Sequence, residues 1–255
     1  MISNFLEILI LSIVQGISEF LPISSSAHLF LVSEIYKFKS QSLLVDVGLH
    51  LGSLLAIIFY FRNELKEIVN NKNLLFLMIL GSLPVIILGA IIYKTGLINY
   101  FRNIEVIAWT TLIFALLLYI ADKFENKKKI ETDLELKSIL IIGVFQILAL
   151  IPGVSRSGIV ITAGRFLNFS RYDSTKISFY LSIPAIAGAS FLSLKSLVDK
   201  NIDLNLIVLV SILLSFIFSY LTIKYFLIFV KKFTLSTFVI YRIILSAILF
   251  LTIYT

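Results

Sequence analysis

The stretch Gln15-Gly16-Ile17-Ser18-Glu19-Phe20-Leu21-Pro22-Ile23-Ser24-Ser25-Ser26-Ala27-His28 decides the fold, because it interrupts an apolar segment with a proline and a run of hydroxyl side chains. A second stretch repeats this plan: Gln146-Ile147-Leu148-Ala149-Leu150-Ile151-Pro152-Gly153-Val154-Ser155-Arg156-Ser157-Gly158. We call them the first and second polar motifs. Charged groups inside apolar sequence are costly unless they line a cavity and act there. The pair therefore predicts the place of the functional site and, by repetition, the architecture.

Working outward, the composition is that of a membrane protein. The chain has 255 residues, of which 59% are hydrophobic and 15% charged, with a mean hydropathy of +1.01. Soluble domains carry about 25% charged residues. The N-terminus lacks a basic region and a small-residue cleavage site, so we expect the first apolar segment to stay in the protein. Cysteine is absent, which excludes disulfides and thiolate chemistry.

Six apolar stretches run without interruption, and two others are broken by the polar motifs. The uninterrupted stretches are 45–61, 73–93, 104–121, 177–194, 206–223 and 237–254. The broken stretches are 5–35 and 138–167. A proline followed by small or hydroxyl residues breaks a helix. Within a membrane, such breaks persist only where protein or a water-filled cavity surrounds them. We therefore interpret each broken stretch as a re-entrant helical hairpin.

The order along the chain predicts an all-α polytopic membrane protein built from an inverted-topology repeat. Each half would be a re-entrant hairpin followed by three spans, over residues 1–121 and 138–255, with a cytoplasmic linker at 122–137. An odd number of spans per half turns the second copy upside down and brings the two hairpins together near the midplane. Full spans in place of the hairpins would give parallel repeats and a more even distribution of charge.

The basic residues predict the orientation, because positive charge is enriched in cytoplasmic loops. One side would receive fourteen: Arg62, Lys66, Lys72, Lys123, Lys127, Lys128, Lys129, Lys137, Arg165, Arg171, Lys176, Lys224, Lys231 and Lys232. The other would receive six: Lys37, Lys39, Lys94, Arg102, Lys195 and Lys200. We expect both termini and the site to face outside. Because the net charge of +7 is scattered over short loops, no nucleic-acid partner is expected.

The first polar motif offers a carboxylate and three hydroxyls. Gln15 and Glu19 share a helix face, and Glu19 could bind a divalent cation, act as a base or hydrogen bond the loop backbone. Ser24, Ser25 and Ser26 begin the second half-helix, where free N–H groups and the helix dipole favour phosphate. One of these serines could be a nucleophile, and capping of the half-helix is the structural alternative.

A histidine and an arginine complete the candidate chemistry. His28 lies one turn from Ser24 and Ser25, so it could activate a hydroxyl, attack phosphorus itself or protonate a leaving group. Arg156 lies between two serines and needs an anionic partner at this depth. That partner would be phosphate, held bidentately, or a carboxylate, Glu19 or Asp46.

The remaining candidates are less specific. Ser155, Ser157 and Gly153 would help to bind the substrate, and Gly153 and Gly158 would let the backbone approach it closely. Three further polar residues lie near span ends, where interfacial solvation is the default expectation: Asp46, His50 and Asp173.

At these residues the sequence resembles the undecaprenyl-diphosphate phosphatase family, also called bacitracin-resistance proteins. The resemblance rests on (Glu/Gln)-x-x-x-Glu with Pro-x-Ser-Ser-(Ser/Thr)-x-His, here Gln15 to His28, and on Pro-Gly-x-Ser-Arg-Ser-Gly, here Pro152 to Gly158. It implies removal of one phosphate from a C55 polyprenyl diphosphate at an outward-facing site of the bacterial cytoplasmic membrane. It also implies dependence on a divalent cation, Mg²⁺ or Ca²⁺, and bacitracin resistance.

The resemblance also implies roles for individual residues. Gln15 and Glu19 would be the acidic-motif pair and candidate metal ligands, Ser25 the nucleophile, His28 a catalytic partner and Arg156 the phosphate binder. Many members have Glu where this chain has Gln15, which moves a base or metal role onto Glu19. The main alternative is a flippase or secondary transporter, which would need binding groups but no nucleophile with a base. Membrane lipids are the other expected partners, and a homodimer stays open.

Overall fold

The computed structural model describes all residues except 1, 37, 39–41, 199–205 and 255, and its described part contains helices and no strand. Lys37, Lys39 and Lys200, part of the charge count, lie outside the described residues. In this described part, six helices are long and apolar enough to cross a membrane. They are α3 (Leu43–Tyr60), α5 (Lys72–Thr95), α7 (Ile104–Asp122), α11 (Arg171–Val198), α12 (Leu206–Lys232) and α13 (Ser236–Tyr254). The all-helical polytopic architecture is thereby confirmed.

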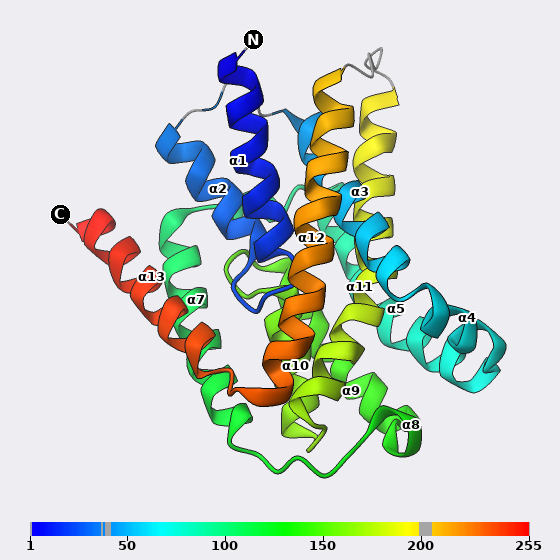
Figure 1. Ribbon diagram of the computed structural model, residues 1–255. Helices are drawn as coiled ribbons and strands as arrows, with labels where there is room; N and C mark the ends of the chain where they lie inside the picture. Colours follow the sequence, from blue (N-terminus) through cyan, green and yellow to red (C-terminus); the bar gives the residue numbers. More distant parts are fainter. Residues whose placement is uncertain (1, 37, 39–41, 199–205, 255) are drawn as a thin grey trace.

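The two broken stretches form pairs of shorter helices. The first pair is α1 (Ile2–Ser18) and α2 (Ser25–Tyr36), and the second is α9 (Leu136–Ile147), continued by a 3₁₀ turn (Leu148–Leu150), and α10 (Arg156–Phe166). Figure 1 shows α1 descending from the end that carries the N-terminus and α9 rising from the opposite end, with their loops meeting in the middle. The Ser157 hydroxyl donates to the Leu21 carbonyl at 2.6 Å, so the two polar motifs are in contact. The division into two inverted repeats stays a prediction.

Both motifs turn at a serine with positive φ. Ser24 and Ser155 have φ of 76° and 71°, although neither is glycine. Such left-handed conformations cost about 1–3 kcal/mol each and persist where the surrounding structure fixes them. Each of these serines directly precedes a half-helix, so Ser25 and Arg156 are corresponding first residues of α2 and α10. The turns therefore point the N-termini of two helices at one region.

Close packing of α3 on α12 places the inner face of α3 beside this region. A Cβ at Gly52 would collide with the Ile212 carbonyl oxygen, so only glycine allows this approach. The Ser215 hydroxyl donates to the Leu49 carbonyl at 2.6 Å. In lipid, helices associate through close contacts between small residues and through hydrogen bonds of this kind.

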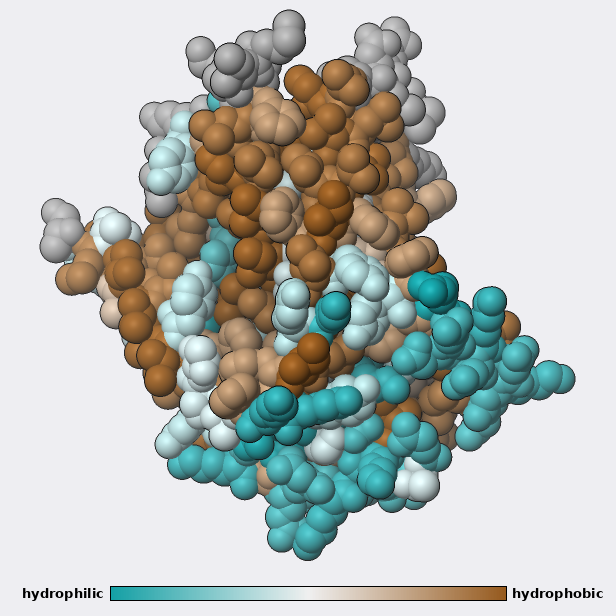
Figure 2. Space-filling model, viewed as in Figure 1, coloured by the Kyte–Doolittle hydropathy of each residue, from teal (hydrophilic) through white to brown (hydrophobic). Residues whose placement is uncertain are grey.

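The end of the molecule opposite the N-terminus is polar. Figure 2 shows hydrophilic surface gathered there, over α4 (Arg62–Asn70) and α8 (Ile130–Asp133), with apolar surface over most of the remaining face. The stretch 62–72, expected as a loop between the apolar stretches 45–61 and 73–93, instead forms the nine-residue helix α4 over most of its length. The 122–137 linker is anchored rather than free: Asp122 pairs with Arg171 at 2.5 Å and with buried Arg165 at 3.6 Å.

Candidate active site

Glu19 is the centre of the polar cluster where the two motifs meet. It follows α1 by one residue and is only 7% exposed. Its Oε1 lies 2.8 Å from Nη2 of Arg156. Its Oε2 accepts hydrogen bonds from the Ser25 hydroxyl at 2.6 Å and from the Gln15 amide at 3.0 Å. A buried carboxylate persists when it is paired and hydrogen-bonded in this way.

Arg156 joins the second motif to the first. Its side chain is 13% exposed, and Nη1 also donates to the Ser178 carbonyl at 3.3 Å. Of the anionic partners that the sequence left open, the structure shows Glu19. Because guanidinium and carboxylate neutralise each other, an arriving phosphate would compete with Glu19 for Arg156.

His50, on α3, joins this cluster although the sequence analysis placed it at a span end. Its Nδ1 lies 2.9 Å from the Gln15 amide nitrogen and 3.7 Å from Oε2 of Glu19. Three residues further on, the Ser53 hydroxyl lies 3.5 Å from the same amide. The spacing of His50 and Ser53 on one helix face was the available signal.

His28 has a different neighbourhood from Ser25. Its Nδ1 lies 2.6 Å from the Ser24 carbonyl oxygen, and its Nε2 lies 2.6 Å from the Tyr241 hydroxyl. The His28 and Tyr241 rings also stack, with centroids 5.7 Å apart. Both imidazole nitrogens are therefore engaged, and the partner of the Ser25 hydroxyl is Glu19 rather than His28.

Arg242, on α13, is fully buried and connects the loops of the two polar motifs. It donates to the carbonyls of Pro22 at 3.3 Å, Gly153 at 2.9 Å and Val154 at 3.2 Å. Within the described residues it forms no ion pair. Arg242 was not among the residues predicted from the sequence, although a lone arginine inside an apolar span is itself a functional signal.

The other candidates surround the cluster or support it. Ser155 accepts from the Gly158 amide at 3.1 Å and so caps α10. Gly153 has φ of 89°, and a Cβ there would collide with Thr110. Ser24 is buried and lies near Ser26, with 3.4 Å between their hydroxyl oxygens. Asp173 lies away from the cluster and accepts from the Ile130 amide at 3.4 Å, which ties α11 to the linker.

The donor set fits a divalent cation only if the substrate supplies ligands as well. In the described part of the chain, no three His, Cys, Asp or Glu side chains gather as metal ligands. Glu19 offers one carboxylate, and the buried Oε1 of Gln15 has no hydrogen-bond partner. Mg²⁺ is commonly held by one or two carboxylates together with substrate phosphates. Gln15 and Glu19 match that arrangement better than a complete protein cage.

Fold and site together define a class: a polytopic membrane protein with a buried ionic cluster where two broken helices meet. The sequence model of one family, described as "Bacitracin resistance protein BacA", matches residues 8–248. The chain belongs to this family.

Curated relatives cover the chain almost completely. A protein of Pelagibacter ubique named "Undecaprenyl-diphosphatase" is 62% identical over 255 residues, which is 100% of both chains. Proteins with the same name from Elusimicrobium minutum and Saccharophagus degradans are 42% and 39% identical; the alignments cover 95% and 97% of this chain and 96% and 97% of theirs.

Proposed function

We propose that this chain is an integral-membrane phosphatase that hydrolyses undecaprenyl diphosphate to undecaprenyl phosphate and inorganic phosphate. The reaction recycles the lipid carrier of cell-wall synthesis and confers bacitracin resistance by removing the diphosphate that bacitracin binds. Full-length identity of 62% to a relative of that name supports the activity. The observation that carries the chemistry is the contact of the Ser25 hydroxyl with the Glu19 carboxylate, beside Arg156.

In the proposed mechanism, Ser25 is the nucleophile and Glu19 is its base. The Ser25 oxygen attacks the terminal phosphorus while its proton passes to Glu19 over the 2.6 Å hydrogen bond. The P–O bond to the bridging oxygen breaks, and undecaprenyl phosphate leaves with that electron pair. Glu19 passes its proton to the departing undecaprenyl phosphate and becomes a carboxylate again. Water then attacks the phosphoserine, and Glu19 takes a proton from the water. The P–O bond to Ser25 breaks, phosphate leaves, and Glu19 returns the proton to the Ser25 oxygen.

Phosphate binding would fall to the two helix starts. Arg156 turns part of its guanidinium from Glu19 to the phosphate oxygens, and the first N–H groups of α2 and α10 add positive potential. The hydroxyls of Ser24, Ser26, Ser155 and Ser157 and the backbone at Gly153 belong to the two motifs that meet here and would help to bind the substrate. Gln15 and His50 hold the Glu19 carboxylate in place through the contacts described above.

His28 is the second candidate for the nucleophile. Its contacts with Ser24 and Tyr241 favour a positioning or proton-transfer role, because both ring nitrogens are occupied.

A divalent cation, Mg²⁺ or Ca²⁺, held by Glu19, Gln15 and the substrate, would neutralise charge on the diphosphate.

The setting of this reaction is the bacterial cytoplasmic membrane. We propose that the two hairpin-plus-three-helix halves form an inverted-topology repeat and that the site and both termini face outside. The polar end of the molecule, which carries most of the basic residues, would then face the cytoplasm (Figure 2).

The test is phosphate release from C55 polyprenyl diphosphate by the purified full-length protein in detergent, with and without a chelator. We expect turnover that falls at least tenfold with the chelator and returns on addition of Mg²⁺ or Ca²⁺. Glu19→Gln should lose at least about 100-fold in kcat, whereas Glu105→Gln, at an exposed glutamate on α7, should keep it. Movement of the lipid between leaflets without phosphate release would instead support the transporter alternative.

A further inference from the structure

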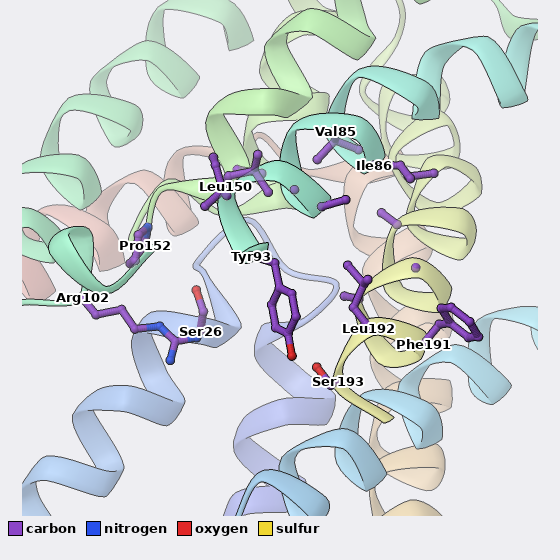
Figure 3. Close-up of a pocket in the computed structure, with 17 residues that line it drawn as sticks. Ser26, Val85, Ile86, Tyr93, Arg102, Leu150, Pro152, Phe191, Leu192 and Ser193 are labelled. Atoms are coloured by element: carbon purple, nitrogen blue, oxygen red, sulfur yellow. The ribbon is translucent and has the colours of Figure 1, made fainter. Parts of the chain in front are cut away.

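A cavity of about 490 Å³ lies between α5 and α11, next to the polar motifs. Its size falls within the range of about 300–1,000 Å³ typical of small-ligand sites. Most of its walls are apolar, with Ile86, Leu150 and Phe191 among them, as Figure 3 shows. A cavity with such walls favours an apolar ligand over water, which needs several polar partners.

Two glycines on facing helices keep the cavity wide. A Cβ at Gly188 of α11 would meet only Ile86, at 3.9 Å, and one at Gly89 of α5 would meet only Leu150, at 3.4 Å. These are ordinary contact distances, so side chains at these positions would occupy space that is open in the structure. The space suits a flexible hydrocarbon.

One end of the cavity is polar because Ser26 and Arg102 border it. In Figure 3 the Arg102 side chain reaches toward Ser26 from the segment between α6 (Ile98–Phe101) and α7. Within the described part of the chain, the exposed guanidinium of Arg102 makes no hydrogen bond or ion pair. A cation at the end of an apolar cavity complements an amphiphile with an anionic head group.

We propose that Arg102 binds the lipid-linked phosphate of the substrate, the one that the product keeps, while the cavity holds the first isoprenoid units. This inference rests on the proposed function. The order of groups matches along both molecules: the hydrocarbon in the cavity, the first phosphate at Arg102 and Ser26, and the terminal phosphate at Ser25 and Arg156. Ser26 lines the cavity, and the adjacent Ser25 contacts Glu19, so the two regions adjoin.

The first test measures binding, because binding does not depend on turnover. Purified full-length protein and its Arg102→Gln variant are titrated with polyprenyl monophosphate in detergent. We expect about tenfold weaker binding by Arg102→Gln, as for loss of one charge-assisted contact, and partial recovery in Arg102→Lys. The control is Lys94→Gln, an exposed cation next to Tyr93 that does not line the cavity, and it should bind as the wild type does.

Two further ligands separate the sources of binding. Polyprenol, which lacks the phosphate, should bind more weakly than the monophosphate and equally to wild type and Arg102→Gln. Inorganic phosphate should compete poorly, because it lacks the hydrocarbon. Equal affinity of wild type and Arg102→Gln for the monophosphate, or the same loss in Lys94→Gln, would overturn the proposal.

The second test measures turnover of the diphosphate. Arg102→Gln should raise KM about tenfold and change kcat less than about twofold, because the groups at the reacting phosphorus are intact. A loss confined to kcat contradicts the assignment. Wild-type protein that binds the monophosphate through Arg102 but releases no phosphate from the diphosphate would disprove the proposed function, and only the binding of a polyprenyl phosphate at Arg102 would remain.

Discussion

At the residue scale, the contact between Arg156 and Glu19 predicts that activity depends on a guanidinium group and not on positive charge alone. Lysine keeps the charge but not the planar pair of donors with which Arg156 would hold Glu19 and a phosphate together. We therefore expect Arg156→Lys to lower kcat/KM for the diphosphate about 100-fold or more. Arg62→Lys, at an exposed arginine of α4, is the control and should be neutral. Near-normal turnover in Arg156→Lys would disprove the proposal that Arg156 binds Glu19 and a phosphate together.

The identity of the nucleophile gives a second prediction at this scale. Ser25→Ala should reduce turnover to background and still bind substrate, because the hydroxyl on Glu19 is lost while Arg156 remains. His28→Ala should keep part of the activity. Loss of its contact with Tyr241 should lower turnover mainly by displacing the loop between α1 and α2. A trapped phosphoenzyme distinguishes the candidates: one that is labile in acid and stable in base is phosphohistidine and would refute the assignment to Ser25.

Proximity could be predicted for residues one helical turn apart and for the two motifs that repeat one plan. Gln15 and Glu19 are one helical turn apart, and the repetition of the motifs suggested that Arg156 would lie near Glu19. His50 and Arg242 come from other helices, and sequence spacing carries no information on which face of a distant helix meets the loop. His28 was expected within reach of Ser25 because the two lie one helical turn apart. The turn at Ser24, with its positive φ, instead directs the two side chains to different partners.

At the scale of elements, the approach of α3 to α12 depends on glycine. A Cβ at Gly52 would collide with the α12 backbone, and overpacking of this kind costs about 1–3 kcal/mol. Gly52→Val should therefore lower the apparent Tm in detergent by several degrees and also reduce turnover, since α3 carries His50. Leu55→Val, at a half-exposed position of the same helix, should change neither. An unchanged Tm in Gly52→Val would show that the helices can separate without cost.

Arg242 acts between elements, because α13 holds the loops of both hairpins through it. Arg242→Met keeps most of the volume but leaves the carbonyls of Pro22, Gly153 and Val154 without their donor. We expect a large loss of kcat together with faster proteolysis or hydrogen exchange of both loops. Loss of kcat with unchanged loop protection would instead place Arg242 on the substrate.

Long apolar stretches predicted helices well, whereas polar helices were missed. The six spans follow from length and hydropathy alone, and both breaks follow from Pro22 and Pro152. The α4 segment was expected to be a loop because it is rich in charged residues, among them Glu64, Lys66 and Glu67. In the structure its only buried residue is Ile68. A helix with so little apolar surface is stabilised by its place next to α3 and α5, which hydropathy does not report.

At the scale of the whole molecule, the uneven distribution of basic residues predicts the orientation in the membrane. The end with α4 and α8 is hydrophilic in Figure 2, and positive charge marks the cytoplasmic side. The chain has no cysteine, so single cysteines report on accessibility without background. Tyr254→Cys and Asn4→Cys, near the two termini, should react with an impermeant maleimide in intact cells. Asn73→Cys, exposed at the start of α5, should react only after permeabilisation. The reverse pattern would show that the protein has the opposite orientation in the membrane. The site of Glu19 and Ser25 would then open to the cytoplasm, where it could not act on a lipid diphosphate at the outer surface.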